Sequence, residues 1–112
     1  MRDTLFLIRA PFEDLGAKWF CHDCAAMEGA LLANPQWGRA IDVRRLPFPK
    51  PRHEIIALIG EANQSMPVLV IADADKAPIQ ADRTPEGRAF LAKPKEIARY
   101  LAAAHGGAGP HP

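Results

Sequence analysis

The sequence predicts a single α/β domain with the order β-α-β-α-β-β-α, in which helices flank a four-stranded mixed sheet. Three observations lead to this fold class. The chain has 112 residues, of which 48% are hydrophobic and 24% are charged, so it can bury one core but not two. Short apolar runs rich in strand formers alternate with stretches in which apolar residues recur every three or four positions. Prolines, glycines and asparagines separate these segments.

The first half of the chain predicts two strands and two helices in alternation. Thr4–Ile8 is a short apolar run and predicts a buried strand. Helix formers from Cys21 to Ala33 predict a helix, with Asn34-Pro35 as its stop signal. The β-branched, alternating segment Ile41–Leu46 predicts the second strand, and the apolar face of His53–Ala62 predicts the second helix.

The second half predicts a hairpin and a closing helix. Val68–Ala72 is the most apolar run and predicts the third strand, followed by a turn and a short fourth strand at Pro78–Gln80. Thr84 is a candidate N-cap, so Pro85–Ala92 predicts a helical turn or two. Lys95–His105 predicts the last helix. We therefore expect one domain over residues 1–105 and a flexible C-terminal tail over residues 106–112.

Charge and hydropathy limit the classes of partner. Fourteen basic and thirteen acidic residues leave a net charge of +1, so nothing in the overall charge favours nucleic acid or an anionic membrane. The apolar run that ends at Ile8 is too short for a signal sequence or a membrane span. We expect a cytoplasmic protein with no nucleic-acid or membrane partner.

Basic residues cluster at Arg44, Arg45, Lys50 and Arg52. A solvated face is the favoured interpretation, and a site for an anionic ligand is the alternative.

The only two cysteines, Cys21 and Cys24, stand three apart at the start of the first predicted helix. Cytosolic thiols are kept reduced, so such a pair is more often catalytic, redox-sensing or metal-binding than a structural disulfide. A helix N-terminus favours the thiolate form of a cysteine, through unpaired backbone N–H groups and the helix dipole. Cys21 is then the candidate nucleophile, and Cys24, one turn deeper, is its resolving partner.

The neighbours of the cysteines leave several readings open. A protonated His22 would stabilise a nearby thiolate, whereas an ionised Asp23 would disfavour it. The alternative is that these residues have no chemical role: His22 would be an exposed loop residue, and the two cysteines would pack in the core. Trp19 and Phe20 are expected to pack in the core or at its rim.

A metal site needs more ligands than this segment supplies. No second CxxC and no HxxxH motif completes a set of four, so we predict no metal within one chain. A zinc ion or an iron–sulfur cluster shared in a dimer is the remaining metal hypothesis. No glycine-rich phosphate-binding motif is present.

The other unusual feature is Met66-Pro67, which opens the third predicted strand. Proline at the first residue of a strand is either a tolerated edge residue or part of a cis turn. The residues alone leave both possibilities open.

A CxxC after the first strand, a βαβ half, an X-Pro step, a hairpin and a final helix together resemble the thioredoxin-like superfamily over nearly the whole chain. The resemblance implies that Pro67 is cis and faces Cys21. It also implies that the backbone of Met66 can pair with a bound peptide or glutathione.

Within that superfamily the chain is similar to a bacterial family named domain of unknown function 3088. The stretches that carry the resemblance are MRDTLFLI, Phe20 to Cys24, IDVRRLPFPKPR, IGEANQSMPVLVIAD and HGGAGPHP. The family name implies no activity.

Glutaredoxins and the N-terminal domains of glutathione transferases resemble the chain more distantly. Lys18 stands three residues before Cys21, where glutaredoxins often keep a lysine for a carboxylate of glutathione. Ala72–Asp75 lacks the paired glycines and the aspartate turn with which glutaredoxins hold the glutamyl end. Glutathione is therefore a weakly supported substrate.

The leading hypothesis is a thiol–disulfide oxidoreductase that uses Cys21 and Cys24, without a cofactor, on a protein or low-molecular-weight disulfide. Lys18, His22, Asp23, Met66 and Pro67 are the candidate tuning or substrate-binding residues. The alternatives are a non-enzymatic binding or redox-sensing module and a metal site shared in a dimer.

Overall fold

The computed structural model describes residues 1–112 and has a five-stranded mixed sheet with a separate two-stranded hairpin. The strands are β1 (Thr4–Ile8), β2 (Phe12–Asp14), β3 (Ala17–Trp19), β4 (Asp42–Leu46), β5 (Val68–Ile71), β6 (Asp82–Arg83) and β7 (Ala89–Leu91). The helices are α1 (His22–Ala33), α2 (Pro35–Ala40), α3 (His53–Ile59) and α4 (Pro94–His105), and a single 3-10 turn, η1, spans Ala74–Lys76. The predicted α/β class is confirmed, but the main sheet has five strands where four were expected.

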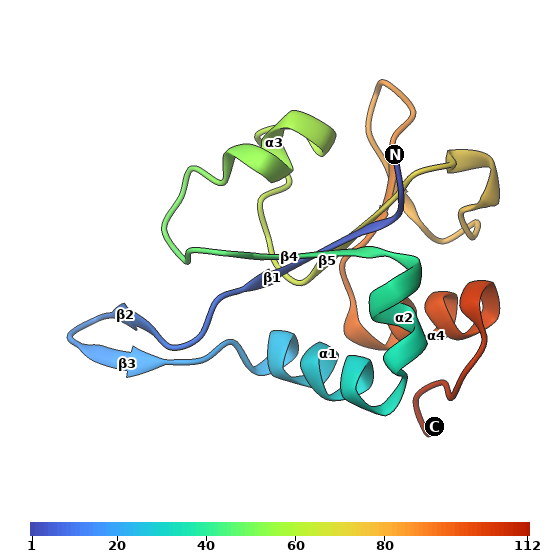
Figure 1. Ribbon diagram of the computed structural model, residues 1–112. Coiled ribbons are helices and arrows are strands. Elements are labelled where there is room, and N and C mark those ends of the chain that lie inside the picture. The colour runs from blue at the N-terminus through green and yellow to red at the C-terminus, as the bar shows by residue number, and fades with distance from the viewer.

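The strand order is β4-β1-β5-β7-β6. β4 runs parallel to β1, with Ile8 opposite Leu46, and the remaining neighbours are antiparallel. Figure 1 shows α1, α2 and α4 on one face of this sheet and α3 on the other. The carboxyl end of β1 therefore meets the start of β5, and α1 begins nearby.

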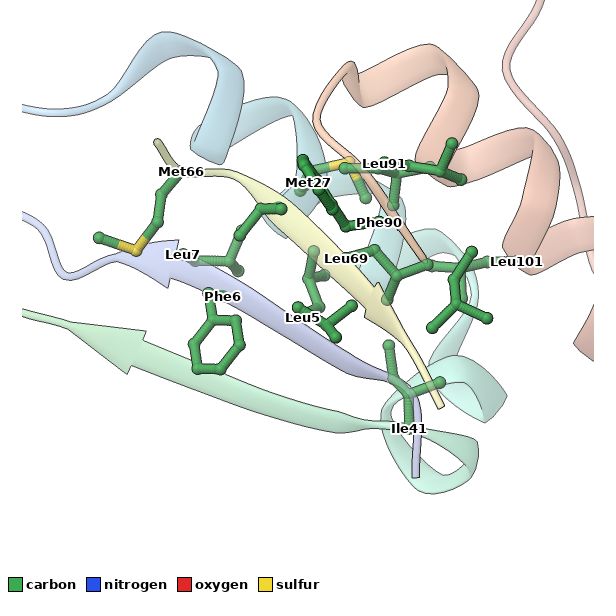
Figure 2. Packing of buried hydrophobic residues seen from close by; sticks show 14 of the residues in the cluster. Leu5, Phe6, Leu7, Met27, Ile41, Met66, Leu69, Phe90, Leu91 and Leu101 are labelled. Carbon is green, nitrogen blue, oxygen red and sulfur yellow. The ribbon is translucent and has the colours of Figure 1, made fainter. Parts of the chain in front are cut away.

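The core lies on both faces of the central strands. Successive strand residues point to opposite faces, so Leu5 and Leu7 face α1 and α4, whereas Phe6 faces the other side (Figure 2). Leu69 and Leu91 continue the helix-side layer on β5 and β7 (Figure 2). All five side chains are at most 2% exposed. This packed centre fixes the positions of β1 and β5, whose ends carry the cysteines and Pro67.

The β2–β3 hairpin and α2 were not predicted. β2 and β3 form a hairpin through Leu15 and Gly16, whose φ angles of 51° and 74° are those of a tight two-residue turn. α1 ends at Ala33, as the Asn34-Pro35 stop signal predicts, but a second helix, α2, begins at once with Pro35 in its first helical position.

The prediction for residues 78–92 was wrong. Pro78–Gln80 is not a strand, and Pro85–Ala92 is not helical. Instead β6 and β7 form a hairpin, in which Thr84 accepts a hydrogen bond from the backbone of Arg88 and Gly87 adopts a φ of 90°. The buried run Ala89–Leu91 extends the sheet and so overrides the local helix-start signal.

The end of α3 and the start of the C-terminal tail also differ from the prediction. α3 stops at Ile59, three residues early, because Gly60 leaves the helix with a φ of 89°. The start of the expected tail is anchored, since the indole Nε1 of Trp37 donates to the carbonyl oxygen of Gly106 at 2.7 Å. Asn34 holds Ala108 through two further hydrogen bonds.

Candidate functional site

Cys21 is the N-cap of α1. Its φ and ψ of −76° and 117° are extended, and its Sγ accepts a hydrogen bond from the backbone N–H of Cys24 at 3.2 Å. Side-chain acceptors at this position satisfy one of the four N–H groups that a helix leaves free. The Cys21 sulfur is partly exposed and lies where a negative charge is favoured. The sequence prediction that the pair opens a helix is confirmed.

Cys24 lies on the inner side of the same turn and is 3% exposed. Its Sγ accepts a hydrogen bond from the backbone N–H of Ile8 at 3.4 Å, which ties α1 to the end of β1. The pKa of Cys24 is raised to about 12, first by burial and then by the hydrogen bond with Cys21, against the lowering effect of the Ile8 N–H. The two thiols therefore differ: one faces solvent, and the other is held protonated in the core.

His22 and Asp23 both face solvent. The His22 side chain is 93% exposed and its Nδ1 lies 3.5 Å from the Asp23 carboxylate, whose side chain is 62% exposed. Asp23 adds a small upward contribution to the pKa of Cys24. No hydrogen bond joins His22 to a cysteine, so a tuning role for His22 stays a prediction.

The Met66-Pro67 peptide bond is cis, as the resemblance implies. Pro67 lies directly before β5, and the Sγ of Cys21 lies 4.0 Å from the carbonyl oxygen of Met66. The Met66 side chain is buried in the core beside β1 (Figure 2). The structure thus places the Met66-Pro67 step next to the exposed thiol, although pairing of the Met66 backbone with a substrate stays a prediction.

Lys18 lies in β3, opposite Glu13, and is exposed. The aromatic pair that follows it is exposed too: Trp19 by 47% and Phe20 by 64%. Of the two positions expected for these rings, core or rim, the structure shows the rim, because the hairpin projects away from the main sheet (Figure 1). Trp19 is held instead by its own Nε1, which donates to the carbonyl oxygen of Asp14 at 2.6 Å. An apolar rim consequently precedes Cys21.

Arg52 is the residue that the sequence prediction misjudged. It was grouped with a solvated basic face, and Arg44 and Arg45 do lie on the surface, where they pair with Glu54 and Glu28. Arg52 is only 8% exposed. No sequence signal separates it from the other three basic residues, since its burial depends on the loop that follows β4.

The segment compared with the glutaredoxin glycine turn, Ala72–Asp75, lies far from the cysteines. The backbone N–H of Ala72 donates to Asp3, which precedes β1, whereas Cys24 contacts the other end of that strand. The segment therefore lies at the other end of β1 from the cysteines, and glutathione as a substrate stays a prediction.

A cavity of about 830 Å³ lies at that remote end. Tyr100 and His105 line it beside Asp3, and the Tyr100 hydroxyl donates to the Asp3 carboxylate at 3.1 Å. None of the site residues predicted from the sequence lines this cavity.

No group of three or more His, Cys, Asp or Glu side chains is arranged to hold a metal ion. None of the helices is long and apolar enough to cross a bilayer.

Comparison with known proteins identifies a family but no activity. No curated protein and no solved structure matches the chain. One family model, described as protein of unknown function (DUF3088), matches residues 2–109. This match covers nearly the entire sequence, and the chain therefore belongs to that family.

Proposed function

We propose that the protein is a cytoplasmic thiol–disulfide oxidoreductase of the thioredoxin-like type, acting on protein or low-molecular-weight disulfides. The observation that carries the proposal is the contrast between the two thiols of one helical turn. Cys21 is partly exposed and caps α1, whereas Cys24 is buried and has a raised pKa. An accessible attacking thiol and a sheltered resolving thiol are the two parts that dithiol exchange needs.

The exchange has two steps. The Cys21 thiolate attacks one sulfur of a substrate disulfide, a Cys21–substrate disulfide forms, and the other substrate sulfur leaves as a thiolate that takes a proton from water. Cys24 then loses its proton and attacks the Cys21 sulfur, which releases the second substrate thiolate. The substrate disulfide gains two electrons, and the Cys21–Cys24 pair is oxidised to a disulfide.

The strand order and the cis Pro67 beside Cys21 support the thioredoxin-like assignment. The N–H of Cys24 stabilises negative charge on the attacking sulfur. Burial of Cys24 keeps the second thiol out of reach of bulky substrates until the mixed disulfide has formed.

A redox-sensing or binding module is the second candidate, and the exposed rim favours it. Leu15, Trp19 and Phe20 are 89%, 47% and 64% exposed and lie just before Cys21. Such side chains suit contact with a protein partner, whose binding would respond to the redox state of the pair.

The test uses reduced protein and an aromatic disulfide whose thiolate product is coloured. We expect the unsubstituted protein to release two coloured thiolates per chain and to finish as the Cys21–Cys24 disulfide. Cys24→Ser should release one and retain the mixed disulfide on Cys21, as mass spectrometry would show. The oxidoreductase proposal fails if Cys21 stays unmodified in Cys24→Ser, or if the unsubstituted protein retains its mixed disulfide indefinitely.

A further inference from the structure

Arg52 is a buried cation that has no carboxylate partner. It is 8% exposed, and the ion pairs of the protein involve other residues. Its guanidinium donates to backbone carbonyl oxygens only: Nη1 to Gln64 at 2.7 Å, and Nε to Phe48 at 3.0 Å. These bonds fix the guanidinium in place and leave its charge without a counter-ion. Burying a charge without a counter-ion costs free energy, which the rest of the fold has to offset.

The two residues whose carbonyl groups accept hydrogen bonds from Arg52 are connected, through neighbouring residues, to the contacts of the cysteines. Gln64 lies two residues before Met66, whose carbonyl oxygen is 4.0 Å from the Cys21 Sγ. Phe48 lies two residues after Leu46, the register partner of Ile8, whose N–H donates to the Cys24 Sγ. Arg52 therefore joins the loop after β4 to the segment that leads into Met66, whose carbonyl oxygen lies next to the Cys21 sulfur.

The electrostatics agree with this placement. Burial lowers the pKa of Arg52, and negative charge on Cys24 and then on Cys21 acts in the opposite direction. The other charged groups on the elements around the pair are exposed or already paired. Arg9, Lys18, His22, Asp23, His53 and Glu54 are exposed, and the half-buried Glu28 of α1 forms an ion pair with Arg45. Water and salt screen exposed charges, whereas a buried charge acts through a medium of low dielectric constant.

We propose that Arg52 is a positioning residue that supplies the fixed counter-charge for the thiolates of Cys21 and Cys24. Its role in turnover rests on the proposed function, but its effect on the thiols does not. When Cys24 gives up its proton to water, the new negative charge forms in the field of the guanidinium. Attack on the Cys21 sulfur then moves that charge onto the departing substrate thiolate, and Arg52 is again without a counter-ion.

The first experiment measures the rate of alkylation of Cys21 by iodoacetamide against pH, in a Cys24→Ser background. We expect Arg52→Gln to move the profile to higher pH and to slow the reaction at neutral pH about tenfold, the effect of one unit of acidity. Arg52→Lys keeps the charge and should restore most of the rate. Arg44→Gln is the matched control, because it removes the same charge from an exposed arginine, and it should leave the profile unchanged.

The second readout reports on Cys24. In protein that retains Cys24, release of an aromatic thiol from a mixed disulfide on Cys21 should slow at least about tenfold in Arg52→Gln, since it requires a thiolate beside Arg52. Arg44→Gln should release the thiol at the unsubstituted rate. A merely structural role for Arg52 would give Arg52→Lys and Arg52→Gln the same defect.

A salt series covers the case in which Arg52→Gln does not fold. In the Cys24→Ser protein, molar salt should leave the alkylation profile unchanged, and Asp23→Asn should alter it at low salt only. If molar salt shifts the pH profile of alkylation, exposed charges set the reactivity of Cys21 and the inference is overturned. Equal profiles for Arg52→Gln and Arg44→Gln would overturn it too. Those results leave the proposed function standing. A charge-dependent profile without disulfide exchange would support the inference and contradict the proposed function.

Discussion

At the scale of the residue, the structure gives one amino-acid type two different environments within a single helical turn. The sulfur of Cys21 accepts a hydrogen bond from the N–H of Cys24 at the start of α1, and the sulfur of Cys24 accepts one from the N–H of Ile8 in β1. Only Cys24 is removed from solvent. Two thiols only three positions apart in the sequence therefore differ in their exposure to solvent and in their surroundings.

This separation predicts the order of alkylation. In the reduced, folded protein at neutral pH, iodoacetamide should modify Cys21 at least roughly tenfold faster than Cys24, because the latter is buried and protonated. In denaturant the two rates should become similar. Peptide mapping by mass spectrometry measures both, and faster modification of Cys24 in the folded state would contradict the assignment.

At the scale of the element, the β2–β3 hairpin is joined to the main body by aromatic stacking. The rings of Phe12 and Phe48 lie 4.3 Å apart and 6° from parallel, and the guanidinium of Arg52 lies 5.5 Å from the Phe48 ring centre. The same stack therefore supports the hairpin and the buried arginine.

We predict that Phe12→Ala lowers the free energy of unfolding by about 1 kcal/mol, because it removes one partner of the stack. Leu15→Ala in the same hairpin should change it by less than about 0.5 kcal/mol, because that side chain is 89% exposed. Urea denaturation compares the two variants, and equal effects would show that the stack contributes nothing.

A stronger effect is expected at α2. Trp37 is fully buried and holds Gly106, so Trp37→Ala should cost about 3–5 kcal/mol. Trp37→Phe keeps most of the ring and should cost markedly less. The same urea measurement decides whether this short helix is anchored mainly by its tryptophan.

The sequence patterns predicted the longer strands and helices. β1, β4, β5, α1 and α4 lie where the sequence pattern placed them, to within one or two residues. The pattern failed for strands of two or three residues, which are too short to show alternation, and at Thr84, where a hairpin turn replaces a helix start.

The candidate site follows the same division. The CxxC and Pro67 are local signals, so the sequence alone located them. Arg52 became apparent only in the structure, because Gln64 and Phe48 come together through loops that no local pattern specifies.

At the scale of the whole molecule, the sheet separates two polar clusters. The cysteines lie at the carboxyl end of β1, and Asp3, Tyr100 and His105 lie at its other end. Each cluster holds a group that resists deprotonation, the buried Cys24 in one and the half-buried Tyr100 in the other. The pKa of Tyr100 is raised to about 12, mainly by burial and then by Asp3.

These two groups predict a loss of stability in alkali. The pKa of Cys24 is about 12 in the folded protein, against a model-compound value of 9.0. The contribution of the protonated thiol to the free energy of unfolding is therefore complete below pH 9 and is lost as the pH rises toward 12. The expected decline is about 1 kcal/mol per pH unit. Urea denaturation of reduced protein should show a shallower decline in Cys24→Ser between pH 9 and 10, before tyrosine ionises in the unfolded chain. Identical slopes would contradict the buried thiol.

The central claim is that Cys21 and Cys24 interconvert as one dithiol–disulfide couple. The most direct measurement is a titration of the purified protein through glutathione redox buffers, with both cysteines followed by alkylation and mass spectrometry. The account predicts a single two-electron transition in which both thiols disappear together, and its loss in Cys21→Ser. Two thiols that remain free across the whole range of buffers would contradict it.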